Sequence, residues 1–266
     1  MKKKHLIPVL VFIGLAILSG CSSQSKLSKE SVRLRLHPEN GVTYTATAKA
    51  NMMTMMEVQG QSMSMSQIME TTQSFTAKEV TDAKSVIETQ VDAIKMSISQ
   101  MGMKFDYDSD HPEKTSPMIA EQTKEISNSI KKPVTVTYDA LGKVADKNDD
   151  LDMSQLGNVI LELPEKDVSV GSKWNTNKAQ NVSGTDIKVN MEYTVTAISK
   201  KRVDVSFTGT VESADVTGSY DGTASINPQT GLMMNSTTKT NLSMTINEQG
   251  LTIPITVVGT TTVDVK

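Results

Sequence analysis

Apolar and polar residues alternate along most of this chain, a period-two pattern that is typical of β-strands with one buried face. The alternating stretches are rich in Val, Thr and Ile, and turn residues such as Asp221-Gly222 and Asn227-Pro228 separate them. The chain is therefore predicted to be an α+β protein that is mostly antiparallel β. We expect strands at residues 32–36, 188–198, 203–211, 223–226, 232–245 and 251–265.

Two short helices are expected to interrupt the strands. Ser116 and Pro117 suit the cap and the first position of a helix that ends before Pro133. Its apolar residues are few, so this helix should lie on the surface with one face packed. The second helix is expected at residues 153–163, where Pro164 ends it.

Several features occur twice along the chain in the same order. We interpret them as two pseudo-repeats, at about residues 32–150 and 165–266, although β-rich sequences also share such features generically. The repeats would form two antiparallel sheets or the halves of one strongly curved sheet, as in a half-barrel or a sandwich. The matched segments are residues 38–44 and 167–174, 74–91 and 192–209, and 134–144 and 223–233.

The first twenty residues are typical of a signal peptide. A positive start precedes an apolar run, residues 6–18, that is too short for a comfortable membrane span. Small residues then lead into Cys21, the only cysteine, and this order predicts a bacterial lipoprotein signal with Cys21 acylated. Residues 21–31 are small, polar and charged, and we expect a flexible tether. A plain secretory signal with an accidental cysteine is the alternative.

The residues after Cys21 bear on location. Ser22 stands where an acidic residue would signal inner-membrane retention in enterobacterial lipoproteins, and no acidic cluster follows it. In a Gram-negative host, which this placement assumes, the expected address is therefore the periplasmic face of the outer membrane.

Composition excludes several classes of function. Without Lys2, Lys3 and Lys4, 24 basic side chains remain against 30 acidic ones, and no basic run is interleaved with aromatic residues. This balance argues against nucleic acid as a partner. Aromatic residues make up only 4% of the chain, which argues against a sugar-binding platform. The folded part has no cysteine for a disulfide, so it must depend on a hydrophobic core.

Seven of the eighteen residues from 52 to 69 are methionines. Gln59-Gly60 lies between two alternating runs and suits a tight hairpin turn, in which glycine accepts positive φ. Folding about this turn places Met56 opposite Met63 and Thr54 opposite Met65. One face of the hairpin is then mostly thioether, and its methionines are the candidate ligand-binding residues: Met52, Met56, Met63, Met65 and Met69.

Three interpretations of this thioether face are open. Methionine fills irregular gaps, so the face could be ordinary core, or it could be a deformable wall around an apolar ligand. Thioethers also bind copper(I), and exposed thioethers can be oxidised sacrificially. Met96, Met101 and Met103 on a neighbouring predicted strand extend the patch, which favours a wall or a core over a compact metal site.

No other motif predicts chemistry. Asp106, Asp108 and Asp110 alternate, but the glycine and glutamate of a helix–loop–helix calcium site are missing at the positions that require them. The chain lacks a cysteine nucleophile, a histidine pair for metal and a phosphate-binding glycine loop. We expect a protein that is not an enzyme and uses no metal or cofactor.

The order of four motifs resembles an uncharacterised family of bacterial lipoproteins, found largely in Bacteroidota, that carries a domain of unknown function of the 6263 type. The motifs are GVTYTATA at residues 41–48, FDYDSDHPE at 105–113, DALGKV at 139–144 and LPEKDVSVGSKW at 163–174. The resemblance implies a location in the cell envelope and assigns no activity.

The leading hypothesis is an envelope lipoprotein that binds a lipid-like or otherwise apolar molecule without catalysis. Its expected partners are the membrane, through the lipid anchor, an apolar small molecule and an envelope protein. The alternatives are a structural or protein-interaction subunit of the envelope and a copper(I)-binding protein that uses the methionines.

Overall fold

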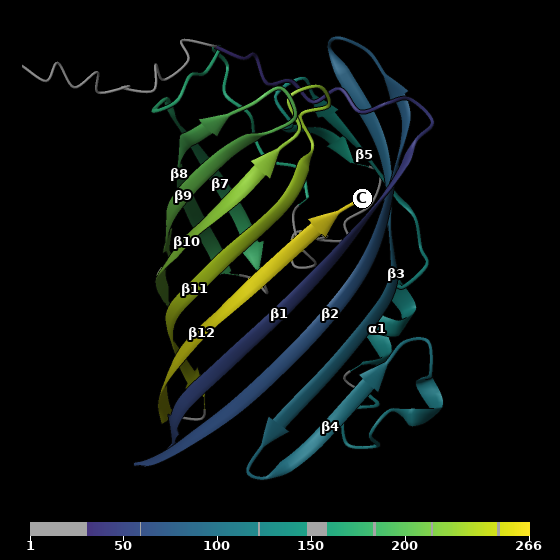
Figure 1. Cartoon of the computed structure of the whole chain (residues 1–266). Helices are drawn as coiled ribbons and strands as arrows, with labels where there is room; N and C mark the ends of the chain where they lie inside the picture. Colours follow the sequence, from purple (N-terminus) through teal and green to yellow (C-terminus); the bar gives the residue numbers. More distant parts are fainter. Residues whose placement is uncertain are drawn as a thin grey trace, which may run out of the picture.

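The computed structural model describes residues 31–58, 60–121, 123–147, 159–182, 185–213, 215–248 and 251–266 (Figure 1). The predicted signal peptide, Cys21 and all but the last residue of the predicted tether lie outside these ranges. No helix within the described ranges is long and apolar enough to cross a membrane.

The described strands form one twelve-stranded sheet in which all strand pairs are antiparallel. Its order is β6-β5-β3-β2-β1-β12-β11-β10-β9-β8-β7, and β4 also pairs with β3. The strands are β1 (Thr43–Val58), β2 (Gln61–Val80), β3 (Lys84–Gln100), β4 (Met103–Asp108), β5 (Val134–Asp139), β6 (Val144–Lys147), β7 (Lys173–Val182), β8 (Thr185–Ile198), β9 (Val203–Glu212), β10 (Val216–Ile226), β11 (Met233–Glu248) and β12 (Leu251–Val265).

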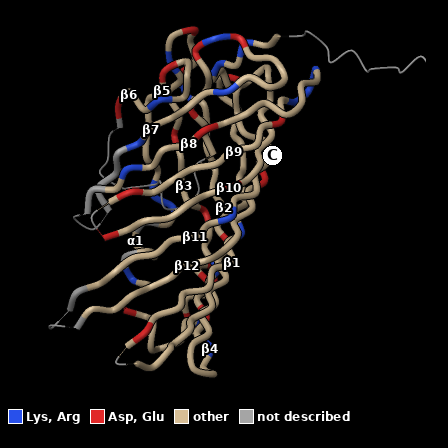
Figure 2. The backbone as a smooth tube through the Cα atoms, turned by 90° about the vertical axis from the view of Figure 1, so that its left-hand side faces the viewer, with Lys and Arg blue, Asp and Glu red and all other residues tan. Residues whose placement is uncertain are grey.

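The sheet is strongly curved. Figure 1 shows β12, β1 and β2 in front, while β7 and β8 on one side and β3 and β5 on the other bend away behind them. We call the inner side, which carries the buried core residues, the concave face and the outer side the convex face. Long stretches of the central strands carry no charge, as residues 240–247 and 251–263 show (Figure 2).

The mostly antiparallel β fold is confirmed, and the single curved sheet replaces the alternative of two separate sheets. Strands β1 and β12 join the part of the sheet built from residues 43–147 to the part built from residues 173–265. Gly41 and Gly171, which precede β1 and β7, both adopt positive φ, at 80° and 87°. The internal duplication itself stays a prediction.

The predicted helices are largely wrong. Within the first, only α1 (Lys124–Ser129) is helical, and a short 3-10 turn, η1 (Pro112–Lys114), precedes the predicted start. The hydroxyl of Thr123 donates to the carbonyls of Ile119 and Ala120, a side-chain interaction that competes with helix extension. Of the second predicted helix, residues 159–163 are not helical, and residues 153–158 lie outside the described ranges.

The predicted strand at residues 32–36 is also wrong, because this segment crosses the concave side instead of joining the sheet. Only one isolated bridge forms, between Val32 and Val168. The alternation in the sequence has another cause: Leu34 and Leu36 are fully buried, whereas Arg33 is exposed and Arg35 half-buried.

Two buried clusters lie on the concave face. The larger one is covered by residues 32–36 and 159–168, which contribute Leu34, Leu36, Val159, Ile160, Leu163 and Val168. The smaller one consists of Val91, Ile94, Tyr107 and Ile119, and Ile126 and Ile130 pack against it from α1 and its end. The segments that cover these clusters leave the lower part of the concave face, near the β1–β2 turn, without a cluster of its own.

Candidate functional site

The β1–β2 hairpin has the predicted register. Gly60 adopts positive φ at 78°, and β1 ends at Val58 opposite Gln61, the first residue of β2. Met56 pairs with Met63 and Thr54 with Met65, as predicted. The candidate methionines Met52, Met56, Met63, Met65 and Met69 therefore lie on one face of the hairpin, the concave one.

The pairing of β1 with β12 extends this surface into the C-terminal half of the chain. Met56 pairs with Ile255, Ile255 with Met244, and Met244 with Val216. The next row runs from Met65 through Thr54, Val257 and Leu242 to Gly218. We call this surface the methionine face: Met52, Thr54, Met56, Met63, Met65, Val216, Leu242, Met244, Ile255 and Val257.

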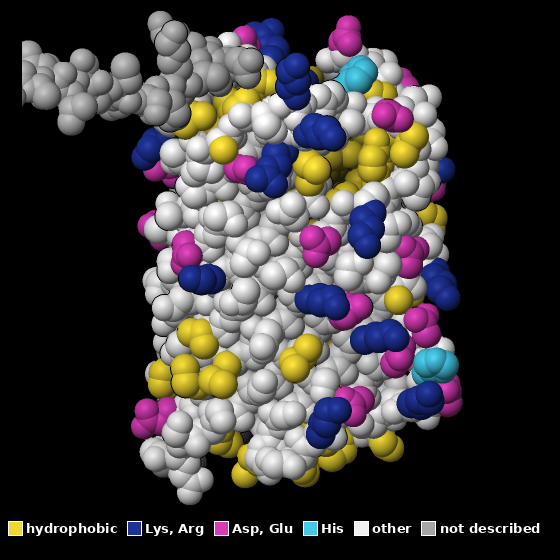
Figure 3. All heavy atoms as spheres, viewed as in Figure 1, with side chains coloured by type: hydrophobic (Ala, Val, Ile, Leu, Met, Phe, Trp, Pro, Cys, Tyr) yellow, Lys and Arg dark blue, Asp and Glu magenta, His cyan; other side chains and the backbone are white. Residues whose placement is uncertain are grey.

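Every residue of the methionine face is partly buried, and none belongs to or packs against the two buried clusters. Methionines on the opposite side of β1 are more exposed, with Met53 at 46% and Met55 at 39%. Figure 3 views the convex face, where small groups of hydrophobic atoms lie low on the molecule and others gather near its top, with charged residues between them. The inward surface is thus apolar, continuous over five strands and incompletely covered.

Met69 has different surroundings from the other four candidates. It pairs with Met96, and both pack against the smaller cluster beside α1. The Gln67 amide nitrogen lies 3.2 Å from the Met96 sulfur. Met101 and Met103 do not extend the patch as expected, because they are 75% and 49% exposed at the β3–β4 turn.

Glycines on the concave face sit beneath large side chains. A Cβ at Gly259 would lie 2.2 Å from the Met52 sulfur, and one at Gly218 would lie 2.6 Å from a methyl carbon of Leu242. The missing side chains let Met52 and Leu242 lie flat across neighbouring strands. Flexible side chains such as Met52 and Leu242 therefore lie close against the backbone of the sheet in the methionine face.

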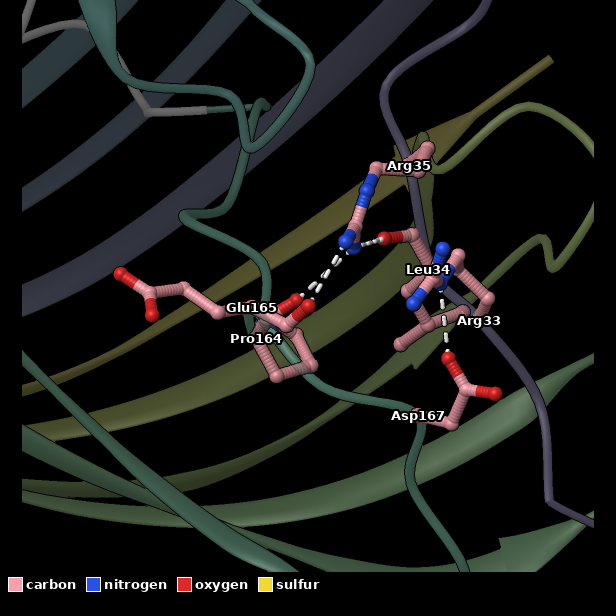
Figure 4. A network of polar contacts seen from close by, with 6 residues as sticks. All are labelled: Arg33, Leu34, Arg35, Pro164, Glu165 and Asp167. Carbon is pink, nitrogen blue, oxygen red and sulfur yellow. Dashed lines mark hydrogen bonds and ion pairs between the residues drawn. The ribbon is translucent and has the colours of Figure 1, made fainter.

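Residues 159–168, which we call the covering segment, lie over the larger cluster and are held in place by hydrogen bonds (Figure 4). The Arg35 guanidinium donates to the carbonyls of Pro164, at 2.9 Å, and Glu165, at 2.7 Å. Nearby, Arg33 pairs with Asp167 at 2.7 Å, with both side chains exposed. The covering segment is thus held by the partly buried Arg35 and the exposed Arg33.

A polar cluster lies where the covering segment meets β7 and β8. Trp174 stacks on Tyr193 with 5.0 Å between ring centroids, and its indole nitrogen donates to the Glu162 carbonyl at 2.9 Å. The Glu162 carboxylate pairs with the Lys178 ammonium at 3.4 Å. Burial raises the pKa of Tyr193 to about 12, against a hydrogen bond with Thr176 that lowers it. This cluster was not predicted from the sequence.

The acidic run near α1 is engaged in local contacts. Asp106 pairs with Lys104 at 3.1 Å, and hydrogen bonds from Lys104 and Ser97 hold its pKa below the usual value. Asp108 pairs with Lys95 at 3.4 Å and accepts from the Asp110 amide. Over the described ranges no three His, Cys, Asp or Glu side chains gather as they would around a metal ion.

Residues 152–250 match a model described as a "Family of unknown function (DUF6263)", which confirms the predicted resemblance to a 6263-type domain. No curated protein matches the chain.

Among solved structures, one of lipovitellin, described as "Lipid-protein interactions in lipovitellin", is similar at a TM-score of 0.50 and 9% identity. That match covers 86% of this chain, which spans only 25% of the lipovitellin chain. The COG4313 outer membrane channel from Pseudomonas putida F1 is less similar, with a TM-score of 0.27, 7% identity and coverage of 86% and 97% of the two chains. The similarity to lipovitellin concerns the fold alone.

Proposed function

We propose that this chain, part of which matches a family of unknown function, binds a lipid-like or otherwise apolar molecule on its methionine face without catalysing a reaction. The observation that carries the proposal is the partial burial of ten inward-facing residues that lie outside both core clusters. A ligand that covers apolar surface on the inner side of the sheet gains roughly 25 cal/mol of binding free energy per Å² of that surface removed from water.

The composition of the face supports a ligand that varies in shape. Met56, Met63 and Met244 occupy one continuous row with Ile255 and Val216. Methionine has three rotatable bonds and a polarizable sulfur, so such a wall adapts to different chains. A rigid wall of valine and isoleucine would suit the strands better on propensity alone.

The likeness to lipovitellin supports the same class of ligand. The lipovitellin structure was described for its lipid–protein interactions, and its similarity to this chain reaches a TM-score of 0.50. A curved sheet that is apolar on its inner side, as in this chain, is a reasonable host for acyl chains.

The proposed location is the cell envelope, with acylated Cys21 as the anchor and the periplasmic face of the outer membrane as the address. The support is the sequence around Cys21 and the 6263-type resemblance. The proposed partners are the membrane, the apolar ligand and an envelope protein. That the protein is not an enzyme rests on the absence from its sequence of a cysteine nucleophile, a histidine pair and a phosphate-binding loop.

The test uses the Cys21→Ser protein, which cannot be acylated, with palmitic acid and a phosphatidylethanolamine as probes. Native mass spectrometry should show added mass on the protein with no further substitution. Met56→Gln with Met63→Gln places amides in the apolar row and should weaken uptake at least about tenfold. Met53→Gln with Met55→Gln on the convex face of the same hairpin is the matched control and should leave uptake unchanged.

The two alternatives give different results. A structural subunit would show bare protein with every probe and a crosslinked partner in cells. Copper(I) binding by the paired thioethers would be lost in Met56→Leu with Met63→Leu, which keeps the face apolar and should keep lipid uptake. Bare protein in all lipid titrations would overturn the proposed function.

A further inference from the structure

Three of the connections between neighbouring strands contain no charged residue. They join β1 to β2, β3 to β4 and β11 to β12, and the ends of these six strands lie low on the molecule in Figure 1. We call this part of the protein the hairpin end. The strands that lead to it also lack charge over long stretches, at residues 50–56, 61–69, 96–103, 240–247 and 251–263.

The connections at the opposite end of the sheet are strongly charged. The β2–β3 connection and its flanks carry Lys78, Glu79, Asp82 and Lys84. Residues 199–202, between β8 and β9, read Ser-Lys-Lys-Arg. A surface that faces water normally carries charges of both signs among its apolar residues. The opposite end has this character, and the hairpin end does not.

Large apolar side chains of the hairpin end are exposed. Met101 and Met103, at the β3–β4 turn, are 75% and 49% exposed, and Ile246 of β11 is 44% exposed. Met53 and Met55 add exposed thioethers on the convex side of β1. Figure 3 shows hydrophobic atoms along the lower edge of the molecule. Because these residues come from all three hairpins, the exposed apolar surface extends over much of this end.

This exposed surface is continuous with the methionine face. Ile246 pairs with Ile253, two residues along the strands from the pair Met244 and Ile255, so it faces the same inward side. On the other side of the methionine face, β3 alone separates β2 from β4, the strand that begins at Met103. An acyl chain can therefore move between the hairpin end and the methionine face along uncharged side chains.

The charge pattern favours a lipid bilayer as the partner of this end. Charged side chains are costly inside a bilayer, whereas a protein interface tolerates a charged rim. The nearest charges are Glu57 on β1 and the ion pair of Lys104 with Asp106 on β4. The β9–β10 connection carries Glu212 and Asp215, so it lies outside this surface. Anionic lipids attract clusters of basic residues, and the uncharged stretches contain none, so a zwitterionic bilayer fits best.

We propose that the hairpin end inserts shallowly into a zwitterionic lipid bilayer and that the apolar ligand enters and leaves the methionine face there. Met101, Met103 and Ile246 are the inserting residues, and their flexible or branched apolar side chains replace water with acyl chains. This inference rests on the proposed function, to which it adds the source of the ligand and its route.

A fluorescent label tests the insertion directly, because Cys21 is the only cysteine of the chain. In the Cys21→Ser background, Met101→Cys carries a polarity-sensitive nitrobenzoxadiazole label. Vesicles of palmitoyl-oleoyl phosphatidylcholine should shift its emission to the blue and increase it. Val144→Cys places the same label at a position that is 58% exposed on β6, away from the hairpin end, and should show no change. An unchanged signal at Met101→Cys, or equal changes at both positions, would overturn the insertion.

A second pair of variants tests which residues bind the vesicles. Met101→Glu with Met103→Glu places two carboxylates at the hairpin end and should weaken flotation with the vesicles at least about tenfold. Val42→Glu with Val144→Glu makes the same change at two exposed apolar positions of the opposite end and should leave flotation unchanged. Equal flotation of both double variants would show that the hairpin end is not the docking surface.

Uptake from vesicles tests the route of the ligand. Extraction of a fluorescent phosphatidylethanolamine from the same vesicles should be slower in Met101→Glu with Met103→Glu. Uptake of palmitic acid from solution, followed by native mass spectrometry, should be unchanged because the methionine face is intact. This second measurement also shows that the variant is folded. Extraction at the unchanged rate would overturn the route.

The outcomes separate this inference from the proposed function. Palmitic acid uptake without any binding to vesicles refutes the docking surface and leaves the proposed function standing. Vesicle binding by a protein that takes up no acyl probe refutes the proposed function and the ligand route with it. A dimer in sedimentation equilibrium that Met101→Glu with Met103→Glu abolishes, with no vesicle binding, would assign the hairpin end to a second copy and overturn the bilayer as its partner.

Discussion

The Met52 sulfur lies over Gly259, its partner on the neighbouring strand β12, where an added Cβ would approach it to 2.2 Å. The same Cβ would also meet the Asn51 carbonyl oxygen at 2.6 Å, and backbone atoms yield less easily than a thioether. Gly259→Ala should therefore lower the free energy of unfolding by about 1–3 kcal/mol, the usual cost of overpacking. Urea unfolding monitored by circular dichroism measures the change.

A double-mutant cycle with Met52→Ala isolates the side-chain part of this contact. Removing the thioether makes room at Gly259, so the loss in the double variant should be smaller than the sum of the two single losses. Strict additivity would show that Met52 does not lie on Gly259 in solution.

The two arginines that hold the covering segment should contribute unequally. Arg35→Ala removes donors to three carbonyls, those of Leu34, Pro164 and Glu165, and should cost about 1.5–3 kcal/mol. Arg33→Ala breaks an exposed pair with Asp167 and should cost less than about 1 kcal/mol. Urea unfolding gives both values, and amide hydrogen exchange at Val168 should rise more in Arg35→Ala. Equal losses would contradict this difference in burial.

Stability should fall at alkaline pH because of Tyr193. Burial raises its pKa from 10.0 to about 12, so the folded protein keeps a proton that the unfolded chain releases. The contribution is fully present below pH 10 and is lost as the pH rises toward 12, at a cost of about 2–3 kcal/mol. Tyr193→Phe should show a shallower decline in the unfolding free energy over this range. Burial also raises the pKa of Tyr138 and Tyr220, so a residual slope should persist.

The Thr71→Val substitution should raise the free energy of unfolding of the protein. Its side chain is 2% exposed, and its hydroxyl is the one buried side-chain polar atom of the described residues without a hydrogen-bond partner. Thr71→Val keeps the shape and removes this unpaired group, so unfolding should require about 1 kcal/mol more. Thr72→Val, on the opposite side of β2 and only partly buried, is the control and should change little. A loss of stability in Thr71→Val would reveal a partner for the hydroxyl.

The β1–β2 hairpin was predictable because its information is local. A two-residue turn at Gly60 sets the register, and the register decides which methionines share a face. Strand β12 was also predicted with its observed bounds, Leu251–Val265, from alternation, its content of Val, Thr and Ile, and the turn residues before it. Local periodicity and turn residues sufficed for these strands, but the predicted turn at Asp221-Gly222 is wrong, because both residues lie inside β10.

The segment at residues 32–36 shows how the same pattern can mislead. Leu34 and Leu36 are buried, but the backbone of this segment pairs with Val168 and Ala140 in irregular segments rather than with a strand. Alternation reports which side chains are covered, and it does not report what accepts the backbone hydrogen bonds. The short α1 was mispredicted for a similar reason. Its few apolar residues contact the smaller cluster from a single short helix, and the sequence pattern does not report how long that helix is.

The sequence by itself determined that the chain forms antiparallel strands and that Met52, Met56, Met63, Met65 and Met69 face the same way, because strand period and hairpin register are local properties. Only the tertiary structure decided that β1 pairs with β12, that Met69 is covered beside α1, and that the other four join Leu242, Met244, Ile255 and Val257 in an incompletely covered surface. The physical reason is that strand adjacency and coverage depend on the combined packing of segments far apart in the chain, which no local pattern encodes.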